Sequence, residues 1–325
     1  MKSISGCCHI LLFYGLGGTD LPHFSSGNDA LRALTDDERA ISIFGKSPFV
    51  VTRNGLRYFL SEDPIFHSDV GESHQDQCLA TFAGLGLPLN TPIRVKSRQF
   101  HIKDLLTESL ANFSFDQKEL AWSAIAFAKY LPPQKEWVSR FGERKSFTKL
   151  TSYLIRRDLN LESCAGTHIL QALVHIDNAD RESPLLEPNT RQELQTYLAS
   201  NVVQLLRHQR EDGSWEKQWS DVINDSIEAK RAFELRLVVT GHVLEVLGVI
   251  DRSYRPAPVV YQKAAGWLKQ ALNSPQIKSD GSWVCPFTHA ARGARQIAAP
   301  AAAAAYGSST FSTARSSGVD INKNK

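Results

Sequence analysis

Histidines at the start of apolar segments are the residues of this sequence best suited to chemistry. They are His74, His168, His242 and His289, and each begins a run with the apolar spacing of a helix. Cysteines stand four residues before two of them, in Cys164-Ala-Gly-Thr-His168 and Cys285-Pro-Phe-Thr-His289. Imidazole and thiolate together suit Zn²⁺. A metal ion could therefore be bound wherever the fold brings these segments together.

We predict that the imidazoles of His168, His242 and His289 line one central cavity. Cys164 or Cys285 is then the fourth group. The candidate metal ligands are Cys164, His168, His242, Cys285 and His289. Two other interpretations stay open: the imidazoles line a polar cavity without a metal, or they only cap helices and hydrogen-bond between them. Zinc is thus one of three interpretations of the same residues.

Further side chains are predicted to face the same cavity. Glu245 follows His242 by three residues, and Trp122 lies in a similar apolar run, Glu119–Ala128, that lacks a histidine. The predicted cavity and ligand-binding set is His74, Trp122, His168, His242, Glu245 and His289. Core packing is the alternative for Trp122, since large aromatic side chains are usually buried.

The apolar runs repeat along the chain. They begin at or near residues 74, 121, 168, 242 and 289, so the intervals are about 47 residues, apart from one of 74. That period fits a hairpin of one apolar inner helix and one amphipathic outer helix. We predict an all-α domain with five inner helices, starting near residues 74, 118, 166, 238 and 288. Such hairpins either stack into an open solenoid or close into a ring.

Two copies of a short motif stand between these helices. Gln209-Arg-Glu-Asp-Gly-Ser-Trp215 and Gln276-Ile-Lys-Ser-Asp-Gly-Ser-Trp283 both fit Q-x(3–5)-G-x-W. The glycine can end an outer helix in a left-handed cap. We predict that Trp215 and Trp283 then wedge between successive hairpins.

The motif resembles the QW motif of the terpenoid cyclases and the related protein prenyltransferases, over roughly residues 100–297. The whole chain also looks like uncharacterised bacterial members of that superfamily. The resemblance implies an α/α toroid around a central cavity, and some members hold a catalytic zinc there. The carboxylic-acid motifs of the cyclases and the Asp-Asp-x-x-Asp motif are absent from this sequence. The resemblance therefore implies a fold and assigns no reaction.

The remaining segments divide the chain into four parts. We predict a flexible leader over 1–27 and an N-terminal segment over 28–70, in which residues 48–60 form a β-hairpin around Asn54-Gly55. The toroid covers 71–297, and the pattern there is helical throughout. Residues 298–325, rich in alanine and then serine, are predicted to be disordered.

Composition excludes several classes of protein. The 37 basic and 34 acidic residues leave a net charge of +3, which is too small an excess of basic residues to indicate binding of nucleic acid. No apolar run approaches the roughly 18 residues of a transmembrane helix. Five irregularly spaced cysteines do not form a disulfide scaffold. We expect a cytoplasmic protein, with export left open by the short apolar run at 10–16.

Two functions remain for such a protein. The first is the binding of a small apolar ligand, a peptide or a partner protein in a central, histidine-lined cavity, without an established reaction. The alternative is a terpenoid cyclase-like or prenyltransferase-like enzyme, with or without zinc. The sequence does not decide between them, and it does not predict the oligomeric state.

Overall fold

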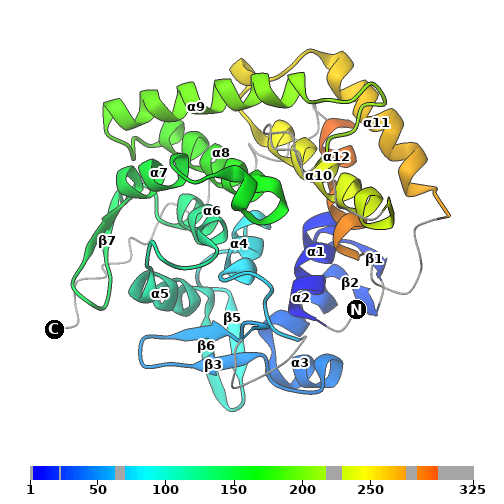
Figure 1. Cartoon of the computed structure of the whole chain (residues 1–325). Helices are drawn as coiled ribbons and strands as arrows, with labels where there is room; N and C mark the ends of the chain where they lie inside the picture. The colour runs from blue at the N-terminus through cyan, green and yellow to red at the C-terminus, as the bar shows by residue number, and fades with distance from the viewer. Residues whose placement is uncertain (1–2, 22, 63–69, 217–228, 276–283, 299–325) are drawn as a thin grey trace.

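The computed structural model describes residues 3–21, 23–62, 70–216, 229–275 and 284–298 (Figure 1). This part of the chain is mostly helical, with twelve α-helices and four two-stranded antiparallel sheets. The expectation of a helical protein thus holds. The predicted tail from residue 299 onward and Trp283 lie outside the described residues.

Six of the helices pack in a closed cycle of contacts. They are α1 (Ile4–Tyr14), α4 (Gln77–Gly84), α6 (Leu120–Tyr130), α8 (Thr167–Glu182), α10 (Ala229–Val249) and α12 (Val284–Ala298). Each packs against the next in this order, and α12 packs against α1. We call these six the inner helices. The last five coincide with the predicted apolar runs, although α10 begins at residue 229 rather than near 238.

Helix α1 occupies the place of the flexible leader expected over residues 1–27. Its first eight residues, from Ile4 to Leu11, are all buried. The Ser3 side chain caps the helix by accepting a hydrogen bond from the Gly6 amide. Most of the short apolar run at 10–16 lies in this helix. Helices α2, α4 and α12 pack against α1 and cover its side chains. The leader prediction is therefore corrected for Ile4–Tyr14, because these residues belong to the core.

Other helices lie outside the cycle, as α9 and α11 do in Figure 1. They are α2 (Gly27–Thr35), α3 (Asp37–Phe44), α5 (Ile102–Asn112), α7 (Phe147–Ile155), α9 (Pro188–Arg207) and α11 (Pro258–Leu272). Helices α2, α5, α7, α9 and α11 each pack on at least one inner helix. Within the described residues, no helix is both long and apolar enough to cross a bilayer.

Short β-hairpins precede several outer helices. The hairpin expected at residues 48–60 is present, as β3 (Phe49–Val51) and β4 (Leu56–Tyr58). The other pairs are β1 (Thr19–Leu21) with β2 (Phe24–Ser26), β5 (Pro92–Val95) with β6 (Arg98–His101), and β7 (Glu136–Val138) with β8 (Arg144–Ser146). Strands β2, β6 and β8 run directly into α2, α5 and α7. The prediction that residues 71–297 are helical throughout is therefore wrong at β5–β8.

The first QW-like segment ties α9 to two neighbouring helices. The Gln209 side-chain amide donates to the backbone oxygens of Gly213, at 3.0 Å, and Val260 in α11, at 2.9 Å. Gly213 has φ +94°, and a Cβ atom there would lie 2.3 Å from the carbonyl carbon of Lys263. Trp215 is fully buried. Its backbone and indole N–H groups donate to Thr240 in α10 and Leu205 in α9.

Candidate functional site

Each of the six inner helices, or for α4 the segment just ahead of it, contributes one ring to a row that is buried except at the partly exposed His74. Adjacent imidazoles have centroids 5.2 Å apart for His74–His168, 4.8 Å for His168–His242, 3.7 Å for His242–His289 and 4.7 Å for His289–His9. Helix α6 contributes Trp122, whose indole stacks on His74 and meets His168 edge-on. We call these six side chains the ring row.

The predicted site residues are brought together by this packing. His74, Trp122, His168, His242, Glu245 and His289 all lie in the ring row or against it. His242 and His289 come closest because Gly241 leaves α10 and α12 in backbone contact. A Cβ atom there would lie 2.5 Å from the Ala290 nitrogen. The sequence thus indicated residues that the fold does place side by side.

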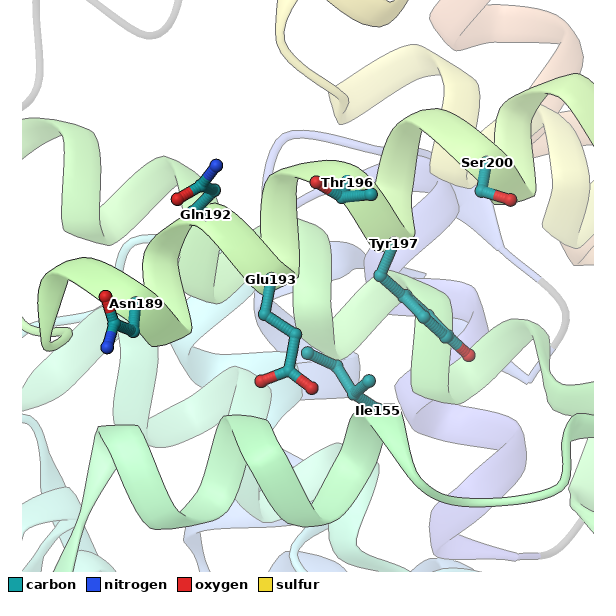
Figure 2. A pocket seen from close by; sticks show the side chains of 7 residues that line it. All are labelled: Ile155, Asn189, Gln192, Glu193, Thr196, Tyr197 and Ser200. Carbon is teal, nitrogen blue, oxygen red and sulfur yellow. The ribbon is translucent and has the colours of Figure 1, made fainter.

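The ring row does not line an open cavity of the kind expected from the sequence. His168, His242 and His289 are 1–4% exposed and touch one another, so their rings fill the space between the inner helices. Among the described residues, a pocket of about 570 Å³ lies between α7 and α9, where Glu193 and Tyr197 of α9 point toward Ile155 (Figure 2). No histidine lines it.

Glu245 connects two of the imidazoles. It is completely buried, and its carboxylate lies 3.0 Å from His242 Nδ1 and 3.1 Å from His289 Nδ1. The Arg292 guanidinium lies 3.4 Å away. Burial opposes ionisation, but His289, Arg292 and His242 outweigh it and hold the pKa of Glu245 well below its usual range. An ionised carboxylate only accepts, so both imidazoles donate from Nδ1.

The remaining ring nitrogens are therefore available as ligands. Burial, with the neighbouring His242, lowers the pKa of His289 to about 4, so this imidazole is neutral at pH 7. A neutral imidazole that donates from Nδ1 has its lone pair on Nε2. His242 Nε2 is buried and has no hydrogen-bond partner, and neither has His168 Nδ1 or His9 Nδ1. Most buried polar groups are paired, so these atoms call for an explanation.

Glu119 supports the other end of the ring row. Its carboxylate lies 3.0 Å from His74 Nδ1 and 3.9 Å from His168 Nδ1. Burial opposes ionisation, but the neighbouring imidazoles of His168 and His74 lower the pKa of Glu119. For His168, the same carboxylate and the Cys164 thiol outweigh burial and raise the pKa. The imidazoles therefore lie beside two ionised carboxylates.

Cys164 approaches the ring row from a strained turn ahead of α8. Cys164 and Ala165 both have positive φ values, 51° and 57°, which non-glycine residues adopt at a cost of about 1–3 kcal/mol. The turn leaves the Cys164 side chain partly exposed. One ligand atom from each of Cys164, His168 and His242 lies within 4.8 Å of the others. These three residues can therefore hold a metal ion.

Cys285 belongs to a different cluster. Ligand atoms of His9, Cys285 and His289 also lie within 4.8 Å of one another. Burial raises the pKa of the Cys285 thiol, which therefore carries its proton at neutral pH. The single site predicted from Cys164, His168, His242, Cys285 and His289 thus becomes two groups that each contain a cysteine, and a third group of His242, Glu245 and His289 joins them. The cause is the order of helices in the cycle, which places α10 beside α8 and α1 beside α12.

Two residues of this centre were missed by sequence reasoning, although a signal was present for both. Glu119 stands where the other apolar runs begin with histidine. His9 begins the run His9-Ile-Leu-Leu-Phe, which resembles His168-Ile-Leu at the start of α8. The predicted leader over residues 1–27 includes His9, which the structure places in α1.

A second pocket, of about 450 Å³, lies under hairpin β3–β4. Its walls include the apolar residues Leu56, Leu79 and Leu105 and the carboxyl groups of Glu72 and Asp76. Burial raises the pKa of Glu72 to about 8, although the Cys78 amide donates to its carboxyl group at 2.6 Å. The pocket therefore contains a carboxylic acid that stays protonated at neutral pH.

Comparisons of the chain with protein-family models, with curated proteins and with solved structures returned no match. The resemblance to terpenoid cyclases and prenyltransferases therefore stays a sequence-based expectation.

Proposed function

We propose that this protein is an α/α toroid whose centre binds a zinc ion through Cys164, His168 and His242. The closed cycle of contacts among the inner helices supports the toroid. The QW-like turn at Trp215, which joins an outer helix to the next inner helix, supports it as well. The metal is proposed in preference to an apolar ligand because the ring row is packed rather than open.

The observation that carries the metal proposal is the unpaired Nε2 atom of His242. The opposite nitrogen of the same ring contacts Glu245, and histidines that bind metals nearly always donate to such a group. The Glu119 carboxylate lies 3.9 Å from Nδ1 of His168, which is beyond hydrogen-bond distance. Two imidazoles and a thiolate are ligands that Zn²⁺ prefers, and the two carboxylates favour a cation nearby.

Zinc content tests this proposal. After incubation with Zn²⁺ and desalting, Cys164→Ser and His242→Ala are each expected to hold one zinc per chain less than the wild type. Elemental analysis measures the content. Zinc affinity should also fall as the pH drops below about 6, because ligands must lose their protons.

His208→Ala is the matched control, since His208 stands at the end of α9 and in none of the clusters. Its zinc content should equal that of the wild type. Circular dichroism establishes that each variant keeps its helices. Equal zinc in folded Cys164→Ser, His242→Ala and wild-type protein would refute the proposal.

Acid-catalysed chemistry in the pocket under β3–β4 is a second candidate function. It is favoured by Glu72, because a protonated carboxyl group beside apolar side chains is what cyclisation by protonation needs. Arg53 and Arg140 also line this pocket and could bind an anionic group of a substrate. The candidate agrees with the cyclase resemblance without using a cyclase motif.

The protonation of Glu72 can be measured through stability. Its pKa is about 8 in the folded protein and near 4.5 when exposed, so it contributes stability below pH 4.5 that is lost as the pH rises to 8. Glu72→Gln should therefore raise the free energy of unfolding at pH 8 by about 1–3 kcal/mol. Urea unfolding at several pH values gives this difference. Exposed Glu193→Gln should leave the pH profile unchanged, and an unchanged profile in Glu72→Gln would exclude the protonated acid.

A further inference from the structure

We infer that the chain binds a second ion of the Zn²⁺ type, through His9, Cys285 and His289, and that Glu245 couples the two metal sites. This inference rests on the proposed function, which concerns only the ion at Cys164. It adds a separate site where α12, the last inner helix, packs against α1, the first.

The three side chains already have the arrangement of a ligand set. Cys285 and His289 lie four residues apart in α12, so they share one face of that helix. His9 comes from α1, and its ring meets that of His289 edge-on with centroids 4.7 Å apart. Their ligand atoms lie within 4.8 Å of one another, so small side-chain movements would bring them to metal-binding distances.

His9 supplies an independent indication of a ligand. Its side chain is buried, at 6% exposure, and its Nδ1 atom has no hydrogen-bond partner. His289 uses Nδ1 toward Glu245, which leaves Nε2 for another partner. A thiolate with two imidazoles selects a soft or borderline ion such as Zn²⁺ rather than Mg²⁺ or Ca²⁺.

The two sites share a sequence pattern and one backbone contact, although Cys164 lies in a turn ahead of α8 and Cys285 within α12. Each has a Cys-x3-His segment, and in each the threonine before the histidine donates to the carbonyl of the cysteine. The distances are 2.7 Å from Thr167 to Cys164 and 3.1 Å from Thr288 to Cys285. The third residue comes from the following inner helix of the cycle, which is α10 after α8 and α1 after α12. The second site therefore repeats the first across the closure of the cycle.

Glu245 lies between the two ligand sets. It contacts His242 of the first set and His289 of the second, at 3.0 and 3.1 Å. A carboxylate that orients a metal-binding histidine typically contributes 10–100-fold in affinity. Glu245→Gln is therefore expected to lower the affinity for both ions, whereas substitution of a ligand abolishes the binding of only one.

The experiment is a titration of metal-free protein with Co²⁺, whose thiolate bond gives an absorption band, followed by zinc analysis. The wild type should bind two ions. Cys285→Ser and His9→Gln should each bind one and keep the Cys164 band, and Cys164→Ser should bind one and keep the Cys285 band. His208→Ala should bind two. Circular dichroism checks each variant, and the small Cys285→Ser change covers the case in which His9→Gln does not fold.

Three outcomes would each overturn a different part of these proposals. If the wild type binds one ion, Cys164→Ser abolishes it and Cys285→Ser does not, the second site is refuted and the first stands. If the wild type binds no ion, both fail. If two ions bind but Glu245→Gln changes neither affinity, the coupling is refuted.

Discussion

Trp215→Ala is expected to lower the free energy of unfolding by about 3–5 kcal/mol, the usual cost of removing a large core aromatic. The indole is fully buried between α9 and α10. Its removal leaves a cavity and deprives the Leu205 carbonyl of a donor at 2.7 Å. Both effects act where the outer helix α9 is fixed to the inner cycle. Urea unfolding of metal-free protein, followed by circular dichroism, measures the loss.

Two further variants make this test specific. Trp215→Phe keeps most of the buried area but lacks the indole donor, so its loss should be smaller than that of Trp215→Ala. Phe141 is a large aromatic residue that is 70% exposed, and Phe141→Ala should change stability by less than about 0.5 kcal/mol. A loss below about 1 kcal/mol for Trp215→Ala would show that the tryptophan is not a wedge between hairpins.

Glu245→Ala is expected to cost about 2–4 kcal/mol in the metal-free protein, because it leaves two buried imidazole donors and the partly exposed Arg292 charge without their carboxylate. Arg292, His242 and His289 all direct donors at this carboxylate. Alanine would leave the buried imidazoles of His242 and His289 without an acceptor, and the partly exposed Arg292 without its carboxylate. The same unfolding measurement applies, at pH 7.

Glu245→Gln removes the negative charge of this side chain but keeps its size, so it shows how much of the loss in stability is due to the charge. It keeps an acceptor oxygen and should cost less than alanine. Glu193→Ala, on the exposed face of α9, removes a carboxylate from the surface and should have almost no effect. Equal stability of Glu245→Ala and the wild type would mean that the ring row holds together without its central charge.

The helices were predictable because long apolar runs carry a strong periodic signal. The hairpins at β5–β6 and β7–β8 were not, since strands of three or four residues bury one or two side chains each. Trp137 is the one buried residue of β7. Such segments give almost no alternation, and neither turn contains the Asn-Gly signal that identified β3–β4.

The site was predictable in its residue types and less so in its geometry. The repeated histidines indicated which imidazoles could meet, and His168, His242 and His289 do meet. Their division into two ligand sets depends on which helix follows which around the cycle. No local pattern contains that information. The role of His9 depends on contacts between residues that are 280 positions apart (289 − 9).

The contact between α1 and α12 has a consequence during biosynthesis. The Arg295 side chain donates to the carbonyl of Phe13, at 2.7 Å, across 282 positions of the chain. A ribosome therefore completes α1 long before its partner helix exists. Until then, the apolar surface that α12 will cover is exposed on the nascent chain, and such surfaces are what chaperones bind. Contacts this distant in sequence also form slowly, so the final docking of α12 should be a late step in folding.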